Sequence, residues 1–560
     1  MTRRVAIVGG GSSGLACIKC CLDEGLEPVC FESSDDIGGL WRFKENPEPD
    51  RASIYHSVII NSSKEMMCFS DFPIPAHFPN YMHNSLIMDY FRMYADHFQL
   101  IKYIRLNTKV LQLKQRSDFS HSGQWDVETE NKDGKKEKHI FDAVMICIGH
   151  HCHPNMPLQD FPGIDTFKGE YFHSRDYKSP GEWRNKKAIV VGIGNSGADI
   201  AVELSRVTKQ LYLSTRRGSW ILDRLGYNGF PLDLFFNRVM TFLQSVLPFG
   251  VFCGLAERQL NQRFDHALYN LKPKHRLLDR RPLVNCDLPD QILQGALVMK
   301  PNLRAFRDSG VVFEDGTAEE NIDAVVFCTG YKANFPFLPP GLSEGPDQEL
   351  TLYKRLFPPS LSKPTLAVMG LFQTKGPIQP IMEMQARWAV RVFSGMSYLP
   401  SEKKMMEVIE CDTKRNSKSY PCPRQAALYV DYISYLDFMA GEIGVRPNLL
   451  RLMLRDPVLW VKVAFGPCTP YQYRLTGPGQ WAGARRAILT QWDRVAQPFR
   501  TRAVPEPESR SSVLFSPLLL VLGGTVITAV LMSKNETVPA QILDRCKIFL
   551  KDSWFTGYPQ

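Results

Sequence analysis

The chain carries two glycine-rich stretches of the same form, each directly after a short apolar run. One follows residues 5–8 and reads Gly9-Gly10-Gly11-Ser12-Ser13-Gly14; the other follows residues 188–191 and reads Gly192-Ile193-Gly194-Asn195-Ser196-Gly197. In such a turn the glycines let the backbone approach a pyrophosphate, and the helix that follows donates its first N–H groups to it. A strand, a glycine turn and a helix in this order indicate a Rossmann-like unit. The sequence therefore predicts an α/β fold with two dinucleotide-binding domains.

The residues after the first glycine turn indicate which dinucleotide it takes. A helical pattern over 15–24 leads to a second strand, 28–31, which ends at Glu32. A carboxylate at this distance accepts hydrogen bonds from ribose hydroxyls and repels a 2′-phosphate. The first site is therefore expected to hold FAD or NAD rather than NADP. The alternative is a glycine-rich turn without a ligand.

The second site differs at the corresponding place. Its helix is expected from Asp199 to Glu203, and the next strand, 210–213, runs into Ser214-Thr215-Arg216-Arg217 rather than into an acid. Guanidinium groups match a 2′-phosphate with paired hydrogen bonds, so this site is expected to hold NADPH. The alternative is a solvated loop that carries two arginines. One flavin and one nicotinamide nucleotide together predict an oxidoreductase.

A motif ahead of the second turn carries a family resemblance. Residues 167–177 read FxGxxxHxxxY, with the fixed positions at Phe167, Gly169, His173 and Tyr177. This string resembles the identifying sequence of the flavin-containing monooxygenases, a class B group that also includes Baeyer–Villiger enzymes. Further matches lie at 37–41, 60–64, 327–331, 466–474 and 477–481. The last two are typical of the vertebrate microsomal members, and the resemblance covers residues 1 to about 500.

The resemblance implies a set of cofactor-binding residues. Those expected beside FAD are Gly9, Gly10, Gly11, Ser12, Ser13, Gly14, Glu32, Gly39, Leu40, Trp41, Ile60, Asn61, Ser62 and Gln373. Those expected beside NADPH are Gly192, Gly194, Asn195, Ser196, Gly197, Ala198, Arg216 and Arg217. Asn61 and Asn195 are expected at the reacting centre, because an amide can donate or accept a hydrogen bond there without titrating. Asn195 has a second interpretation as the N-cap of its helix, and His173 is interpreted as a positioning residue rather than a proton donor.

The resemblance also implies the reaction. NADPH would reduce FAD, the reduced flavin would capture O2 as a C4a-hydroperoxide, and a lipophilic amine or sulfide would take up one oxygen atom. Two alternatives share this chemistry: Baeyer–Villiger oxidation of ketones, and an NADPH oxidase activity that releases hydrogen peroxide. His150-His151 and residues 271–276 resemble the vertebrate isoform that favours Baeyer–Villiger oxidation of ketones. Tyr177, by contrast, stands where dedicated Baeyer–Villiger enzymes usually have tryptophan.

Other classes of function are less well supported by the residues. A flavin disulfide reductase needs a CxxC motif facing the flavin, but Cys17-Ile18-Lys19-Cys20 falls on the helix after the first glycine turn. A membrane-tethered scaffold that binds NADPH without turnover would carry no flavin. No metal site is expected. Nucleic acid is not an expected partner either, because the net charge of +9 is dispersed over 560 residues.

The expected organisation is an FAD domain interrupted by the NADPH domain. Residues 1–155 form the first part of the FAD domain, 156–330 the NADPH domain and 331–500 the returning part with C-terminal helices. An all-helical insertion is expected at about 218–300. Within it, residues 239–256 carry no charge but are interrupted by Pro248, which favours either a buried helix pair or a monotopic membrane contact.

The C-terminal part is expected to attach the protein to membrane lipids. After a linker at 501–512, residues 513–532 carry no charge and are long enough for one transmembrane helix, with a buried terminal helix as the alternative. A tail, 533–560, follows. No signal-peptide pattern precedes the strand at 5–8, and several of the 14 cysteines lie in apolar runs. We therefore expect a reduced catalytic body that faces the cytosol from the endoplasmic reticulum membrane.

Overall fold

The computed structural model describes residues 2–49, 51–344, 349–417 and 427–502, which fall into two compact units. Unit 1 comprises Met1–Ser62, Tyr81–Arg224 and Glu257–Ile443. Unit 2 comprises Ser63–Asn80, Leu225–Ala256 and the described part of Gly444–Gln560. The predicted anchor, 513–532, and the tail, 533–560, lie outside the described residues. Within the described ranges, no helix is both long and apolar enough to cross a membrane.

The first parallel sheet of unit 1 carries the first glycine turn. Its strand order is β22-β7-β1-β2-β3, and all neighbouring strands are parallel. The strands are β1 Arg4–Val8, β2 Glu27–Phe31, β3 Ile104–Arg105, β7 Ala143–Ile146 and β22 Leu366–Val368. Because β22 comes late in the sequence, the chain returns to this sheet after it has built the second one.

The second parallel sheet carries the second glycine turn and repeats the same plan. Its order is β14-β11-β10-β18-β9, again with all neighbouring strands parallel. The strands are β9 Glu170–His173, β10 Lys187–Val191, β11 Gln210–Ser214, β14 Leu297–Lys300 and β18 Ala324–Phe327. In both sheets the strand before the glycine turn lies between the next strand along the chain and a later strand, β7 or β18. The structure thus contains two Rossmann-like sheets.

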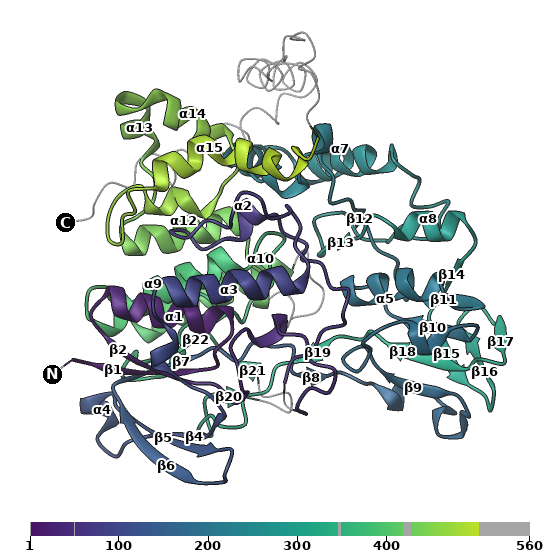
Figure 1. The fold of residues 1–560 in the computed structure, drawn as a ribbon, viewed down its shortest axis with the longest axis horizontal. Coiled ribbons are helices and arrows are strands. Elements are labelled where there is room, and N and C mark those ends of the chain that lie inside the picture. Colours follow the sequence, from purple (N-terminus) through teal and green to yellow (C-terminus); the bar gives the residue numbers. More distant parts are fainter. Residues whose placement is uncertain (1, 50, 345–348, 418–426, 503–560) are drawn as a thin grey trace. The chain divides into compact units, whose positions relative to one another are not determined.

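A small antiparallel sheet precedes the later central strand in each half. The first consists of β4 Thr108–Gln115, β5 Trp125–Asn131 and β6 Lys136–Phe141. The second consists of β15 Leu303–Phe306, β16 Gly310–Phe313 and β17 Ala318–Glu320. Figure 1 shows both beside their parallel sheets. This repeated element supports the view that the two halves are built alike.

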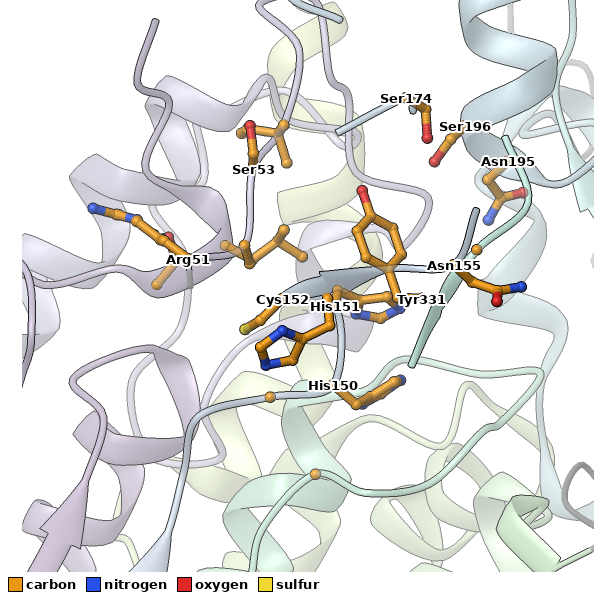
Figure 2. A pocket seen from close by; sticks show the side chains of 18 of the residues that line it. Arg51, Ser53, His150, His151, Cys152, Asn155, Ser174, Asn195, Ser196 and Tyr331 are labelled. Carbon is orange, nitrogen blue, oxygen red and sulfur yellow. The ribbon is translucent and has the colours of Figure 1, made fainter. Parts of the chain in front are cut away.

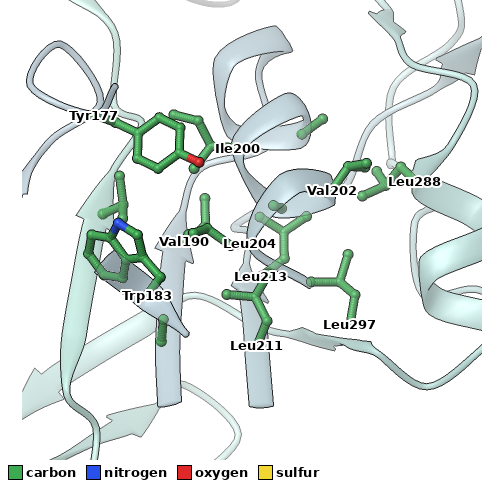
Figure 3. Close-up of a cluster of buried hydrophobic side chains, with 14 of the residues drawn as sticks. Tyr177, Trp183, Val190, Ile200, Val202, Leu204, Leu211, Leu213, Leu288 and Leu297 are labelled. Atoms are coloured by element: carbon green, nitrogen blue, oxygen red, sulfur yellow. The ribbon is translucent and has the colours of Figure 1, made fainter. Parts of the chain in front are cut away.

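The central strand of the second sheet faces two different cores. Ala188 and Val190 belong to a cluster with helices α5 Asn195–Ser205 and α8 Leu288–Leu293, whereas Ile189 and Val191 belong to a cluster on the opposite face. Figure 3 shows the first cluster, in which Val190 lies beneath side chains of α5. A parallel sheet covered on both faces requires apolar residues at every position. The uninterrupted apolar run 188–191 meets that requirement.

Further helices and short strand pairs complete unit 1. The helices are α1 Ser12–Asp23, α3 Asn84–His97, α4 Phe119–Ser122, α9 Gln379–Phe393, α10 Glu402–Ser417 and α12 Tyr432–Ile443. The paired strands are β8 His153–Pro154 with β19 Tyr331–Lys332, β12 Ile221–Leu222 with β13 Leu283–Val284, and β20 Ser343–Glu344 with β21 Glu349–Leu350.

The insertion at about 218–300 is not all-helical, and that prediction is wrong. It contains the parallel pair β12 and β13, and it ends in β14, which belongs to the second sheet. Its middle part, Leu225–Ala256, belongs to unit 2, and the residues on either side belong to unit 1. Apolar periodicity could not reveal this pair because each strand has only two residues.

Unit 2 is mostly helical. Its helices are α2 Lys64–Met67, α6 Arg238–Val246, α7 Phe249–Asn261, α13 Leu449–Arg455, α14 Pro457–Phe465 and α15 Ala484–Ala496, of which α7 ends in unit 1. Helices α6 and α7 are the pair expected at 239–256, and of the two alternatives for this segment the structure does not support a fully buried pair. Their apolar side chains Met240, Phe249, Val251 and Leu255 are between 40% and 55% exposed.

A buried ion pair holds the two ends of unit 2 together. The carboxylate of Glu65, which is fully buried, accepts hydrogen bonds from Arg494 Nε at 2.9 Å and from the Tyr471 hydroxyl at 2.9 Å. Arg474 pairs with Asp71 at 2.9 Å. Removing one partner of such a pair leaves a buried charge without compensation. These contacts therefore fix the segment Ser63–Asn80 to the C-terminal helices.

Candidate functional site

The first glycine turn joins β1 to α1 and has no space for a side chain at Gly14. Gly9 has a φ of 106°, and a Cβ at Gly14 would lie 2.0 Å from the carbonyl oxygen of Gly9. Strand and helix can approach this closely only with glycine at that position. Helix α1 begins at Ser12, and no side chain caps its N-terminus. Its first N–H groups are therefore available to an anionic ligand.

The second glycine turn has the same geometry. Gly192 has a φ of 107°, and a Cβ at Gly197 would lie 2.0 Å from the carbonyl oxygen of Gly192. Helix α5 begins at Asn195, four residues before the expected Asp199, and it also lacks a side-chain cap. A Cβ at Gly194 would meet no atom within 4 Å. The open space beside Gly194 and the uncapped helix fit a second pyrophosphate.

Glu32 connects the end of β2 to the first turn. Its carboxylate accepts hydrogen bonds from the backbone N–H of Gly10 at 2.6 Å and from that of Ser34 at 2.8 Å. Each carboxylate oxygen can still accept a bond from a ribose hydroxyl, because it has a second lone pair. The negative charge also disfavours a 2′-phosphate. The first site therefore fits FAD better than NADPH.

The serine at the end of β11 and the two arginines that follow it are placed differently. The Ser214 hydroxyl is used within the fold, since it donates to the carbonyl oxygen of Pro301 at 2.8 Å and accepts from the N–H of Leu303 at 3.0 Å. Arg216 is exposed and lines the cavity into which the second turn opens, whereas Arg217 does not line it. Arg216 is therefore the better placed of the two arginines to meet a 2′-phosphate.

Both glycine turns open into one cavity of about 1510 Å³ within unit 1. Sites for one small molecule usually measure about 300–1,000 Å³, so this cavity has room for more than one ligand. Figure 2 shows Arg51 on one side, Asn195 and Ser196 on the other, and His150, His151 and Cys152 between them. The cavity thus brings together segments from both Rossmann-like halves.

Most of the predicted site residues line this cavity. They are Gly9, Gly11, Ser12, Ser13, Glu32, Gly39, Leu40, Trp41, Ile60, Asn61, Ser62, Gly192, Gly194, Asn195, Ser196, Arg216 and Gln373. The predicted residues that do not line it are Gly10, Gly14, Gly197, Ala198 and Arg217. Gly14 and Gly197 instead allow the close packing of the turns, and Ala198 is buried in α5.

The Asn61 side chain is oriented by an arginine. Its carbonyl oxygen Oδ1 accepts hydrogen bonds from Arg224 Nη2 at 2.7 Å and from Arg224 Nε at 3.1 Å. With the oxygen engaged, the amide nitrogen is left as a hydrogen-bond donor. The sequence had left open whether this amide donates or accepts, and the structure favours donation.

Asn195 is the first residue of α5 rather than its N-cap, so that interpretation is wrong. The N-cap position is taken by Gly194. The Oδ1 atom of Asn195 accepts from the backbone N–H of Val284 at 3.3 Å, which again leaves the amide nitrogen as a donor. Both asparagines therefore line the cavity with an amide whose oxygen is already hydrogen-bonded.

The residues of the FxGxxxHxxxY motif are used for structure. His173 Nδ1 accepts from the N–H of Arg175 at 3.1 Å, so Nε2 carries the proton and donates to the carbonyl oxygen of Gly330 at 2.9 Å. Burial lowers the pKa of His173, which keeps the ring neutral. The Tyr177 hydroxyl donates to Glu203 at 2.9 Å. His173 thus fixes the backbone after β18, in agreement with a positioning role.

Two histidines from the loop after β7 line the cavity. The ring centroids of His150 and His151 are 4.1 Å apart, and His151 packs edge-on against Tyr331 at 5.4 Å. Burial, together with the neighbouring His150 and the positive charge of Arg281, lowers the pKa of His151 to about 3. His151 is therefore neutral throughout the physiological pH range.

A polar network that could not be predicted from the sequence lies at the wall of the cavity, which Tyr55 and Asp199 line. The Tyr55 hydroxyl donates to Asp199 Oδ2 at 2.8 Å, and Asn285 Nδ2 donates to Asp199 Oδ1 at 2.8 Å. Arg224 lies near this network, because its positive charge opposes the rise in the pKa of Asp199. No local motif marks these residues, which come from distant parts of the sequence and meet only in the fold.

The CxxC segment does not supply a dithiol to the cavity. Cys17 and Cys20 are buried on α1, and Cys17 Sγ lies 3.6 Å from the Sγ of Cys147. Burial raises the pKa of the Cys17 thiol, and its hydrogen bond with Cys147 raises it further, which makes it a poor nucleophile. Across the described ranges, no group of three His, Cys, Asp or Glu side chains is arranged to hold a metal ion.

Comparison with known sequences gives a consistent family. The sequence pattern of the family described as "FMO-like: Flavin-binding monooxygenase-like" matches residues 2–534. The chain is 51% identical to flavin-containing monooxygenase 5 of Rattus norvegicus over 530 residues, covering 94% of this chain and 99% of the relative. It is 52% identical to dimethylaniline monooxygenase [N-oxide-forming] 2 of Cavia porcellus over 526 residues, covering 93% and 98%.

Solved structures share the fold at lower identity. The S-allyl-L-cysteine S-oxygenase of Allium sativum has a TM-score of 0.60 and 23% identity, covering 82% of this chain and 95% of that one. Cyclohexanone monooxygenase of Rhodococcus sp. Phi1 bound to NADP+ has a TM-score of 0.58 and 17% identity, covering 79% and 98%. At these identities the likeness concerns the fold alone.

Two uncapped helix N-termini, two glycine turns without space for a side chain at Gly14 and Gly197, and one large shared cavity suit two dinucleotides. The sequence match extends over nearly the whole chain. The chain belongs to the flavin-binding monooxygenase-like family and is an FAD- and NADPH-dependent monooxygenase.

Proposed function

We propose that the first glycine turn holds FAD, that the second holds NADPH, and that Asn61 and Asn195 lie where oxygen is transferred to a small lipophilic amine or sulfide. The observation that carries this proposal is the shared cavity: both turns open into it, and both asparagines line it with the amide nitrogen left to donate. When bound, FAD supplies the activation of O2 and NADPH supplies the reducing equivalents.

The chain's own residues would bind and orient these groups. The N–H groups at the start of α1 and α5 bind the two pyrophosphates, Glu32 accepts from the ribose of FAD, and Arg216 pairs with the 2′-phosphate of NADPH. Asn61 and Asn195 donate N–H groups to oxygen at the reacting centre. An amide stabilises negative charge that develops there without losing or gaining a proton.

The proposed substrate class follows from what the site offers. Neither asparagine can act as a general base on a substrate, which suits substrates that are already nucleophilic, such as tertiary amines and sulfides. The name of one similar protein, which is N-oxide-forming, agrees with this class. Turnover of a tertiary amine, a thioether and a cyclic ketone under one set of conditions tests it. A clear preference for the ketone would replace this proposal with Baeyer–Villiger oxidation.

Asn61→Ala is expected to uncouple NADPH oxidation from product formation. Without the amide donor, we expect at least a tenfold rise in the ratio of hydrogen peroxide to sulfoxide. This factor corresponds to a change of about 1.4 kcal/mol in the difference between the activation free energies of the two outcomes. The check is the simultaneous assay of NADPH, hydrogen peroxide and sulfoxide. Asn61→Asp is the matched variant, because it can still bind Arg224 but has no N–H. Wild-type coupling in Asn61→Asp would contradict a donor role.

Arg216→Gln is expected to weaken the binding of NADPH selectively. Loss of charge-assisted hydrogen bonds to a phosphate corresponds to about a 10- to 100-fold rise in the KM for NADPH. The KM for NADH, which lacks the 2′-phosphate, should change little. Arg217→Gln removes the same charge from a side chain that does not line the cavity, so it should behave like the wild type. Equal losses in the two variants would mean that the charge acts without a specific contact.

The proposal extends to the membrane and to the cytosolic face of the endoplasmic reticulum. Unit 2 exposes a group of apolar side chains on α6, α7, α13 and α14, among which Leu255 is 55%, Leu454 81% and Val458 59% exposed. Exposed Arg451 and Arg455 on α13 suit anionic lipid headgroups. This surface would lie on the bilayer, and residues 513–532 would cross it.

Leu255→Glu together with Leu454→Glu is expected to weaken membrane binding. In a chain that ends at Arg502, and therefore lacks 513–532, we expect at least a fivefold fall in co-flotation with phosphatidylcholine–phosphatidylserine vesicles. The fall is expected because each glutamate places a charge in the interface. Leu293→Glu is the control, since Leu293 is 73% exposed but lies on α8 of unit 1. Equal flotation of both variants would count against a lipid-binding face on unit 2.

A further inference from the structure

The contact between Arg224 and Asn61 is unusual in its chemistry. Two N–H groups of the guanidinium, Nη2 at 2.7 Å and Nε at 3.1 Å, point at one amide oxygen. A guanidinium has only donors. If the Asn61 amide were rotated by 180°, its NH2 group would face these donors and both hydrogen bonds would be lost. The arginine therefore decides which end of the amide faces away from it.

The backbone around Arg224 is held from two sides. Its N–H donates to the Sγ atom of Cys286 at 3.4 Å, and its carbonyl oxygen accepts from the Tyr81 hydroxyl at 2.8 Å. Arg224 follows β12, which pairs with β13 in a fixed register, Leu222 opposite Val284. The guanidinium is thus presented from a braced segment rather than from a loose loop.

The strand that pairs with β12 orients the second asparagine. The N–H of Val284, in β13, donates to Oδ1 of Asn195 at 3.3 Å. The next residue, Asn285, donates its amide to Asp199, and Asp199 accepts from Tyr55 on the side of the first Rossmann-like half. Strand β13 therefore contacts Asn195, and the residue two positions after β12 contacts Asn61, each through the carbonyl oxygen of the amide.

The charge of Arg224 acts on a carboxylate in the same network. Burial raises the pKa of Asp199, and the Tyr55 hydroxyl, the charge of Arg224 and the amide of Asn285 each oppose that rise. Arg224 thus lies in the field of a carboxylate while its N–H groups bind an uncharged amide. Polarisation of the amide by the cation makes the opposite N–H groups stronger donors.

We propose that Arg224 is a positioning residue for oxygen transfer and that it turns the amide nitrogen of Asn61 into the cavity. The N–H of Val284 does the same for the amide nitrogen of Asn195. The inference rests on the proposed function, in which Asn61 lies at the reacting centre. The insertion is then more than a spacer, because Arg224, just after β12, and Val284, in β13, set both amides as donors. A cation that holds the amide keeps this arrangement fixed before any ligand binds.

The test compares Arg224→Gln, Arg224→Lys, Asn61→Ala and the double variant Asn61→Ala with Arg224→Gln. Each holoenzyme is assayed for NADPH consumed, hydrogen peroxide released and sulfoxide formed, with kcat and KM for the sulfide determined separately. Arg224→Gln is expected to raise the ratio of peroxide to sulfoxide at least tenfold with little change in KM. Arg224→Lys should recover part of the coupling, because an ammonium can still donate one bond to Oδ1.

The double variant separates positioning from a general structural effect. If Arg224 acts through Asn61, the double variant will be no more uncoupled than Asn61→Ala alone, since the amide is already gone. Arg206→Gln is the control: Arg206 pairs with Asp287 near the end of the insertion at 3.0 Å but contacts neither asparagine, and it should behave like the wild type. Flavin content and melting temperature establish that each variant is folded.

The outcomes distinguish this inference from the proposal beneath it. Uncoupling in Asn61→Ala with wild-type coupling in Arg224→Gln would overturn the positioning role and leave the proposed function in place. Wild-type coupling in Asn61→Ala would overturn both. Losses that multiply in the double variant would show that Arg224 acts independently of Asn61. If Arg224→Gln does not fold, the test rests on Arg224→Lys. Full coupling in that variant with an unchanged KM for the sulfide would contradict a requirement for the two guanidinium hydrogen bonds to Asn61.

Discussion

Gly194→Val is expected to reduce NADPH-dependent flavin reduction by at least about 100-fold while leaving the fold and the FAD content unchanged. A Cβ at Gly194 meets no protein atom within 4 Å, so the chain can accept a side chain there. The space it would fill lies at the N-terminus of α5, where the pyrophosphate must approach. Losing two hydrogen bonds to a charged group, each worth about 1.5–3 kcal/mol, corresponds to that factor.

The measurement is anaerobic reduction of the bound flavin by NADPH, followed at the flavin absorbance. Dithionite, which needs no nucleotide site, should reduce the variant as fast as the wild type. Gly181→Val is the matched control, because a Cβ at Gly181 also meets no atom within 4 Å and Gly181 does not line the cavity. NADPH reduction at the wild-type rate in Gly194→Val would mean that the nucleotide binds elsewhere.

Gly14→Ala is expected to yield protein without FAD. The added Cβ would lie 2.0 Å from the carbonyl oxygen of Gly9, which is backbone and cannot rotate away. Either the turn opens, and the N–H groups of α1 lose their direction toward the pyrophosphate, or the strand and helix separate. Purified variant should therefore lack the flavin absorbance and should melt at a lower temperature than the wild type.

A matched substitution makes this prediction specific to one cofactor. Gly197→Ala creates the same 2.0 Å contact, with the carbonyl oxygen of Gly192, in the second turn. It should impair NADPH-dependent reduction, while the first turn still binds FAD. Should Gly14→Ala retain FAD and lose its response to NADPH, and Gly197→Ala do the reverse, the assignment of the two sites would have to be exchanged.

The two Rossmann-like halves could be predicted because their signals are local. The run at residues 5–8 and the run at 188–191 are apolar at every position, as strands covered on both faces must be. The glycines follow directly, and the acid at Glu32 and the arginine at Arg216 come where the second strand ends. Each signal lies within one continuous segment, so no knowledge of distant contacts was needed.

The orientation of the asparagines could not be predicted, because it depends on distant segments. Asn61 is oriented by Arg224 and Asn195 by Val284, both in the insertion, whose strands β12 and β13 have only two residues each. The sequence beside Asn195 also suggested an N-cap, but Gly194 takes that position. Local patterns do not reveal which distant donor reaches a side chain.

The exposure of α6 and α7 could not be predicted from the sequence for a related reason. An uncharged segment such as 239–256 is compatible with a buried pair or with a surface that meets lipid. The structure shows a pair, α6 and α7, four of whose apolar side chains, Met240, Phe249, Val251 and Leu255, are exposed. Amino-acid composition gives the apolarity of a segment, but exposure depends on which other elements cover it.

Isotope labelling of the product follows the transferred oxygen atom itself. The purified holoenzyme would turn over a thioether with NADPH under ¹⁸O₂ in unlabelled water, and the sulfoxide would be examined by mass spectrometry. A monooxygenase that works as proposed here places one ¹⁸O atom in each sulfoxide and consumes one NADPH for each. Unlabelled sulfoxide, or consumption of NADPH that yields only labelled hydrogen peroxide, would contradict oxygen transfer at the cavity that Asn61 and Asn195 line.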